Sequence, residues 1–176
     1  MKKYAILLLM IPFVAFSQSE TNNSFDFWLL KASNDFVKED LKNPNNFPYM
    51  KSLQVAIKNI MDKDTILNYE IFLKAIPKTE SEFSIYFACD YEEDKAIRTA
   101  WGKLDQMLFK NAIKDSNVFI SYLRLSEFVD GYYAESYFDN IEYLIEIHTT
   151  VFCSTYSSLS NECQRKLGDF HESSCE

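Results

Sequence analysis

Glycine and proline are scarce along this chain of 176 residues, and their scarcity limits the possible folds more than any other feature. After residue 17 the chain contains only three glycines and three prolines: Gly102, Gly131, Gly168, Pro44, Pro48 and Pro77. A β-sandwich or barrel of this size needs many tight turns, and these two residue types supply most of them. The sequence therefore predicts an all-α fold, in which helices are joined by short loops.

The N-terminal leader has the three parts of a secretory signal peptide in the required order. Lys2 and Lys3 form the positive end, and an apolar run covers Ala5–Phe16. Small residues at the −3 and −1 positions place the cleavage site before Gln18. The apolar run is shorter than the roughly twenty residues that span a membrane. We therefore predict a signal peptide at residues 1–17 and an exported bacterial protein, periplasmic or extracellular, without stable membrane insertion after cleavage.

The part of the chain after the leader is strongly acidic. Its 159 residues carry a formal net charge of −10, because the leader removes two lysines from a chain whose net charge is −8. A domain of about 150 residues buries enough surface for a core of its own, so residues 18–176 are predicted to form a single helical domain. The negative charge disfavours nucleic acid as a partner, since phosphate binding needs an excess of lysine and arginine. It favours a protein with a basic surface.

Apolar residues recur at helical spacing along most of the chain. These apolar faces predict helices near residues 25–42, 50–61, 97–108, 119–126 and 133–153, with shorter ones at Thr65–Ile76 and Asn161–Leu167. Thr79 and Glu82 have the spacing of a capping box, which predicts the start of another helix. Gly168 is expected to end the last helix. The predicted architecture is an irregular bundle of about six to eight helices, stapled by disulfides at its C-terminal end.

Residues 83–89 fit two patterns. Phe83, Ile85 and Phe87 alternate as in a strand, whereas Phe83, Tyr86 and Phe87 would share one face of a helix. A lone strand is not stable, and no neighbouring segment offers a convincing partner strand. Helix is therefore the favoured interpretation, and strand is the alternative.

The four cysteines, Cys89, Cys153, Cys163 and Cys175, predict two disulfides, since an even number in an exported protein usually pairs. Cys153 and Cys163 flank a serine-rich turn, and their pairing would close a small loop between two helices. Cys89 would then pair with Cys175 and tether the C-terminal tail. Four cysteines allow three connectivities, however, and the sequence does not choose between them. His171 and the last three cysteines offer zinc binding as an alternative, but the paired Cys-x-x-Cys spacing is missing. No metal or other cofactor is therefore predicted.

Recognisable catalytic motifs are missing from the sequence. The two histidines, His148 and His171, lie in no nucleophile, phosphate-binding or metalloprotease motif. His148 shares the apolar face of its helix with Leu144 and Phe152, so we expect a core histidine satisfied by one hydrogen bond. The alternative interpretation of His148 is a buried general base.

Four acidic residues recur at i, i+4, i+7 and i+11 and are predicted to form an acidic ridge on the helix at 133–153: Glu135, Asp139, Glu142 and Glu146. Like charges at this spacing destabilise a helix, which favours cover of the ridge by a basic partner or by neighbouring lysines and arginines. The alternative is an ordinary solvated helix face. Tyr133 and Tyr137 lie at the start of the same helix, and tyrosine supplies rigid contact area at interfaces. These six residues form the predicted binding site.

Three classes of function remain open. The favoured class is a non-enzymatic protein-binding module, such as an inhibitor or an immunity protein, that contacts a basic surface with the acidic ridge. The second is a cell-envelope hydrolase that uses carboxylates or His148. The third is a helical carrier of an apolar ligand, in a pocket lined by residues such as Trp101, Phe119 and His148. The first class accounts best for the acidity, the export signal and the lack of catalytic motifs.

Overall fold

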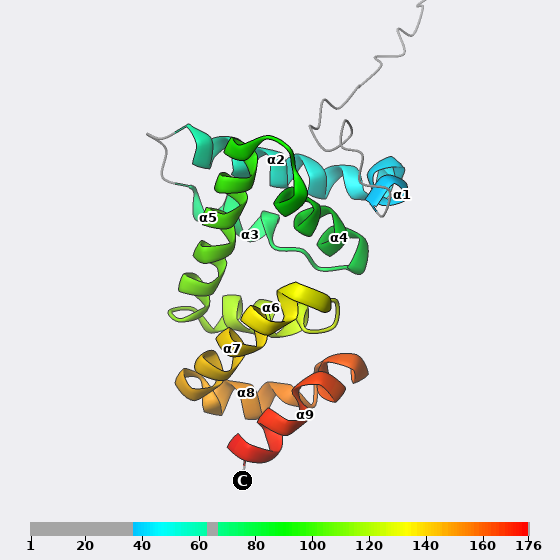
Figure 1. The fold of residues 1–176 in the computed structure, drawn as a ribbon. Helices are drawn as coiled ribbons and strands as arrows, with labels where there is room; N and C mark the ends of the chain where they lie inside the picture. The colour runs from blue at the N-terminus through cyan, green and yellow to red at the C-terminus, as the bar shows by residue number, and fades with distance from the viewer. Residues whose placement is uncertain (1–36, 63–66, 176) are drawn as a thin grey trace, which may run out of the picture.

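The computed structural model describes residues 37–62 and 67–175, and all regular structure in these ranges is helical (Figure 1). The described α-helices are α1 (Lys38–Lys42), α2 (Phe47–Met61), α3 (Tyr69–Ala75), α4 (Glu80–Ala88), α5 (Lys95–Ala112), α6 (Ser116–Leu125), α7 (Gly131–Ile147), α8 (Thr149–Tyr156) and α9 (Asn161–Ser174). Two 3₁₀ turns, η3 (Pro44–Asn46) and η4 (Cys89–Tyr91), connect them. The all-α bundle is therefore confirmed. The predicted signal peptide and most of the helix expected at 25–42 lie outside the described residues.

Helix α5 connects two parts of the molecule (Figure 1). Helices α1 to α4 lie around one end of α5, and α6 to α9 lie at and beyond its other end. The apolar face of α5 is buried along its length and consists of Ile97, Ala100, Trp101, Leu104 and Leu108. One hydrophobic cluster extends through both parts. In the described ranges, no helix has the combination of length and apolar character that crossing a membrane requires.

Side-chain caps determine where several helices begin. Thr79 Oγ1 accepts a hydrogen bond from the Glu82 backbone N–H at 3.2 Å, as the capping-box spacing predicts for the start of α4. The Glu82 carboxylate accepts from the Lys78 backbone N–H at 2.7 Å rather than from that of Thr79. Asp94 and Asp115 cap α5 and α6 through their carboxylates. Such caps satisfy backbone donors that have no partner within the helix.

Residues 83–89 form α4 and the start of η4, which confirms helix rather than strand. Phe83, Ile85 and Tyr86 are all buried, although they project from different sides of the helix. A helix that is buried on several sides has no single apolar face. This burial explains why the same residues also fit the alternation of a strand.

The prediction of one helix at 133–153 is wrong, because the helix is interrupted at His148, between α7 and α8. At the break, His148 Nε2 lies 2.8 Å from the Ala112 carbonyl oxygen at the end of α5. The imidazole ring also stacks on Phe119, with ring centroids 4.8 Å apart. These tertiary contacts stabilise a backbone conformation at His148 that is not helical.

The predicted stop at Gly168 is also wrong, since α9 continues through it to Ser174. A glycine inside a helix costs about 1 kcal/mol relative to alanine. Phe170 lies beyond the glycine and packs against Phe138 of α7, with ring centroids 6.4 Å apart. This packing and the crosslink at the end of α9 offset the cost of the glycine.

A disulfide joins Cys153 in α8 to Cys175 at the end of α9, and their Cα atoms are 5.5 Å apart. The disulfide staple predicted at the C-terminal end of the bundle is therefore confirmed, and the pairing, which the sequence left open, differs from the two considered as examples. The prediction of two disulfides is wrong, since no second disulfide occurs in the described chain. Cys89 and Cys163 are buried, and each sulfur lies beside a backbone carbonyl oxygen. The disulfide uses two of the four ligands considered for zinc. No group of three potential metal ligands is found among the described residues.

Removal of the disulfide in a Cys153→Ser/Cys175→Ser variant should destabilise the C-terminal end of the bundle. We expect the free energy of unfolding to fall by about 3 kcal/mol, because the crosslink spans 22 residues of the unfolded chain. Urea unfolding measures this change. Hydrogen–deuterium exchange should become faster mainly in α8 and α9, and an equal increase throughout α2 to α5 would contradict a local tether.

Candidate functional site

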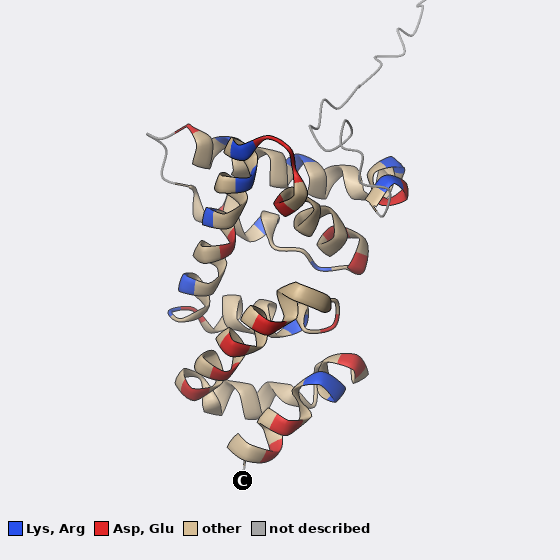
Figure 2. Cartoon of the chain, viewed as in Figure 1, with Lys and Arg blue, Asp and Glu red and all other residues tan. Residues whose placement is uncertain are grey.

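The acidic ridge lies along an exposed face of α7, and Figure 2 shows it as red segments following one another down that helix. All four of its side chains are exposed: Glu135, Asp139, Glu142 and Glu146. Helix α7 contains no lysine or arginine, and the ion pairs in the described part of the chain lie elsewhere. The ridge is therefore a negative surface that no described cation covers.

The two tyrosines predicted to join the ridge in the binding site lie in the core instead. Tyr137 is fully buried, and its hydroxyl donates a hydrogen bond to the Tyr122 carbonyl oxygen at 2.7 Å. Tyr133 is only 9% exposed. Both tyrosines lie one turn apart on the face of α7 that is turned away from the ridge. The exposed tyrosines of α7 are Tyr132 and Tyr143, so these are the ones available to a partner.

The Asp105 carboxylate lies where three helices meet. Its Oδ1 accepts a hydrogen bond from the Tyr86 hydroxyl of α4 at 3.0 Å and another from the Tyr133 hydroxyl of α7 at 2.7 Å. Burial raises the pKa of the Asp105 carboxyl, while the two phenol hydrogen bonds oppose the rise. The sequence analysis missed this residue. Its signal is a carboxylate four positions after Trp101, on the apolar face of α5.

His148 has the single hydrogen bond that its sequence context predicts. A carbonyl oxygen only accepts, so Nε2 carries the hydrogen in the bond to Ala112. No carboxylate or hydroxyl group in the described chain hydrogen-bonds to the His148 ring. The nucleophile–base–orienting group arrangement that imidazole catalysis uses is therefore not formed around it.

A groove of about 590 Å³ lies between α3 on one side and α6 and α9 on the other. Its walls combine apolar, polar and charged side chains, among them Leu73, Ile76, Phe128, Leu159, Asn117, Ser121, Lys78 and Arg124. Two carboxylates in the groove are already engaged, Asp115 by the Tyr69 hydroxyl and Glu127 by the Ser160 hydroxyl. The size of the groove suits a small ligand.

The residues expected to line a ligand pocket lie elsewhere. Trp101 and Phe119 are buried in the core, and His148 contacts the end of α5 rather than the groove. Apolar periodicity identified them as inward-facing, which is correct, but inward-facing side chains fill the core in most helices. The groove is formed by residues near helix ends and in loops, where periodicity carries no signal.

No family model, curated protein or solved structure matches this chain. Three features of the chain itself bear on its function: the exposed acidic ridge, the groove and the half-buried Asp105. The ridge and the groove are the candidates for contact with another molecule, because the Asp105 carboxylate already binds two phenol hydroxyls.

The raised pKa of Asp105 predicts how an Asp105→Asn variant responds to pH. The folded state holds the Asp105 proton more tightly than the unfolded state, whose carboxyl has a pKa near 3.8, so this group reduces stability as the pH rises above that value. Asparagine keeps an oxygen acceptor for both phenols but does not ionise. The stability of the variant relative to wild type should therefore increase between pH 3 and pH 7, as measured by urea unfolding.

Asp105→Leu is the matched comparison, because it removes the acceptor as well as the charge. Two buried phenol hydroxyls then lack a partner, which should cost about 2 kcal/mol or more. A stability difference between Asp105→Asn and wild type that stays constant with pH would contradict the raised pKa.

Proposed function

We propose that this chain is an exported, non-enzymatic protein-binding module, such as an inhibitor or an immunity protein, whose partner presents a basic surface. The observation that carries the proposal is the acidic ridge on α7, an exposed row of four carboxylates with no described cation paired to it. The net charge of the chain, −8, has the same sign as the ridge. Complementary charges of this kind accelerate encounter and exclude partners of like charge.

The ridge has an energetic cost when no partner is bound. Glu135 and Asp139 occupy positions i and i+4, as do Glu142 and Glu146. Each such pair of like charges destabilises a helix by about 0.2–0.5 kcal/mol. Lysine or arginine side chains of a partner would remove this repulsion. Exposed ion pairs contribute only about 0.2–1 kcal/mol each, so useful affinity requires several pairs at once. A row of four carboxylates provides this multiplicity.

Binding is favoured over hydrolysis because the candidate catalytic groups already have structural partners. Glycoside hydrolysis needs two carboxyl groups that face each other across a cleft, one of them able to give up a proton. In the groove, the carboxylates of Asp115 and Glu127 accept hydrogen bonds from Tyr69 and Ser160. The ligand-carrier alternative retains one observation in its favour, which is the volume and partly apolar lining of the groove.

Export is part of the proposal and is supported by the order of charged, apolar and small residues in the leader. The Cys153–Cys175 disulfide is also typical of proteins that work in an oxidising compartment. An inhibitor or immunity protein that acts outside the cytoplasm needs an export signal, and a disulfide is stable in that compartment.

Charge reversal on the ridge tests the binding surface. A Glu142→Lys/Glu146→Lys variant should bind the partner at least about tenfold more weakly, because each change replaces an attraction by a repulsion. The partner is first identified by a pull-down from the envelope and secreted fractions of the host, and dissociation constants are then measured at low and high salt. The melting temperature should change little, since both side chains are exposed.

Asp169→Lys/Glu172→Lys is the matched control, because it changes the net charge equally on an exposed part of α9. This control should retain most of the wild-type affinity. Equal affinity of the ridge variant and wild type would exclude the ridge as the contact surface and would favour the ligand-carrier alternative.

Processing of the leader tests export. In the native host, the mature chain should begin at Gln18, which N-terminal sequencing of the envelope and secreted fractions can determine. Reversal of the positive end in a Lys2→Glu/Lys3→Glu variant should reduce export, because the signal needs this charge for its orientation. Recovery of the wild-type chain from the cytoplasm with Met1 in place would contradict the proposal.

A further inference from the structure

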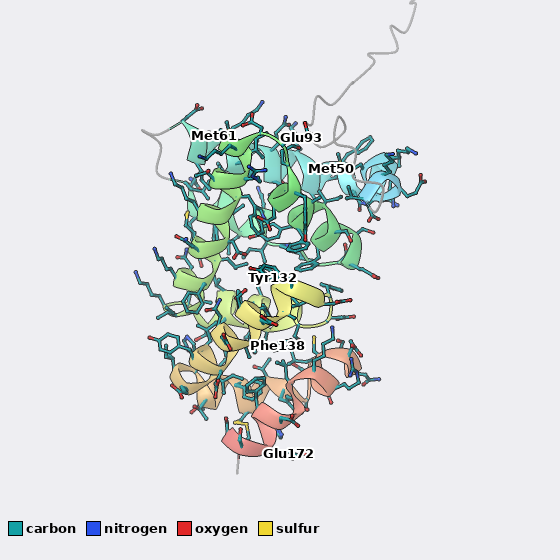
Figure 3. The ribbon with its side chains drawn as sticks, viewed as in Figure 1. Met50, Met61, Glu93, Tyr132, Phe138 and Glu172 are labelled. Carbon is teal, nitrogen blue, oxygen red and sulfur yellow. A yellow bond between two sulfur atoms is a disulfide. The ribbon has the colours of Figure 1, made fainter. Side chains whose placement is uncertain are left out.

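A shallow aromatic cavity of about 330 Å³ lies between α4, η4 and the start of α7, and it is separate from the groove. We call it the aromatic bowl and define it by its six aromatic lining residues: Phe83, Phe87, Tyr91, Phe128, Tyr132 and Tyr133. Figure 3 labels Tyr132 at the start of α7, near the middle of the view. The bowl was not identified from the sequence, because its residues come from two stretches that lie far apart along the chain, 80–91 and 128–133.

Ring contacts join five of the six rings, and the Tyr132 ring takes part in none of these contacts. Phe87 is central, with its ring centroid 5.4 Å from that of Tyr91, 5.3 Å from that of Tyr133 and 6.1 Å from that of Phe83. Phe83 and Tyr133 are buried and form the base, whereas Tyr91 is 53% exposed and Tyr132 is 87% exposed. Solvent therefore reaches the rings from the outer side.

The backbone at Gly131 explains how Tyr132 comes to be so exposed. Gly131 has φ of +59°, a conformation that L side chains rarely adopt, and a Cβ atom placed there would meet no atom within 4 Å. Glycine is therefore needed here because the turn into α7 requires a positive φ, and not because a larger side chain would clash with a neighbour. This turn places Tyr132 outside the core, while the following residue, Tyr133, points into it.

The charges around the bowl are negative. Glu80 and Asp130 line it, both are exposed, and neither forms an ion pair in the described chain. Asp130 precedes α7, but its carboxylate makes no capping hydrogen bond. Beneath the bowl, the Tyr133 hydroxyl donates to the Asp105 carboxylate at 2.7 Å. No lysine or arginine lines the cavity.

We infer that the aromatic bowl binds an arginine side chain of the basic protein partner. Aromatic faces attract cations, and the planar guanidinium group of arginine stacks on such faces while its N–H groups bind carboxylates. Glu80 and Asp130 are placed to accept those hydrogen bonds. An anion would be repelled by them, and a neutral apolar group would bury them without a partner.

The position of the bowl connects this inference with the proposed function, on which it rests for the source of the arginine. Tyr132 precedes Glu135 by three residues and therefore lies at the end of the same face of α7. A basic surface that covers the ridge would thus bring cationic side chains to the rim of the bowl.

The direct test is a titration of the full mature chain with Nα-acetyl-arginine amide, followed by NMR of the tyrosine ring resonances. Nα-acetyl-citrulline amide is the control probe, because citrulline has nearly the same shape as arginine but no charge. Nα-acetyl-arginine amide should bind weakly and saturably, and it should shift the ring resonances of Tyr91 and Tyr132. Citrulline amide should produce no saturable shift.

Substitutions in the bowl should weaken this binding without unfolding the chain. Tyr132→Leu removes an exposed aromatic face and should lower the affinity for arginine amide about threefold. Glu80→Gln/Asp130→Asn removes the two carboxylates and should lower it by at least as much. Tyr143→Leu changes another exposed tyrosine of α7 that does not line the bowl, and it should leave the affinity unchanged.

Three results would overturn the inference: equal binding of citrulline amide, no saturable binding of arginine amide, or tighter binding of tetramethylammonium, which would indicate a small quaternary ammonium ligand instead. These results are independent of the ridge variants. If Nα-acetyl-arginine amide binds but the Glu142→Lys/Glu146→Lys variant captures the partner normally, the inference about the bowl is supported and the ridge is excluded as the contact surface. If ridge reversal weakens capture but arginine amide does not bind, the bowl alone fails.

Discussion

The hydrogen bonds to Asp105 hold the two parts of the molecule in register. The carboxylate belongs to α5, which connects the parts, and it accepts from Tyr86 of α4 on one side and from Tyr133 of α7 on the other. Apolar packing around it is not directional, whereas each hydrogen bond has a narrow range of distance and angle. The two hydrogen bonds therefore favour one specific arrangement of α4, α5 and α7. Partial burial of the carboxylate costs free energy, and the hydrogen bonds offset this cost.

The same interaction determines which face of α7 meets solvent. Because Tyr133 binds Asp105 and Tyr137 binds the Tyr122 carbonyl oxygen, one face of α7 is held against the core. The ridge residues lie on the opposite face of α7 and are therefore exposed to solvent. A change that released Tyr133 would rotate or loosen the start of α7, and it would disturb the bowl and the ridge together.

The existence of the helices could be predicted from the sequence because it depends on local signals. Apolar spacing and caps such as Thr79 act within one or two turns. The break at His148, the continuation of α9 through Gly168 and the Cys153–Cys175 pairing depend on contacts between distant segments. The spacing of apolar residues contains no information about those contacts, so these three features could not be predicted from it.

The candidate site likewise has some features that local sequence signals predict and others that depend on contacts between distant segments. The ridge could be predicted because its four carboxylates repeat along one helix, and a helical repeat places them on one face. The burial of Tyr133 and Tyr137 also follows from this repeat, since they lie opposite the ridge, so the prediction that they join the ridge in one binding surface is wrong. The bowl could not be predicted, because Phe87, Phe128 and Tyr132 meet only through the arrangement of α4 and α7.

In the proposed complex, the ridge and the bowl would have different roles. From Glu135 to Glu146 the ridge spans twelve residues, or about 16 Å along the helix axis, and it presents a carboxylate on nearly every turn. A basic surface could therefore shift along it by one turn and keep most of its ion pairs, because exposed ion pairs tolerate loose geometry and contribute little each. A cavity at one end of the row removes this freedom, since an arginine side chain enters it in only one register. On this view the ridge attracts the partner and the bowl determines how the partner is positioned, so the affinity and the orientation of the complex depend on different residues.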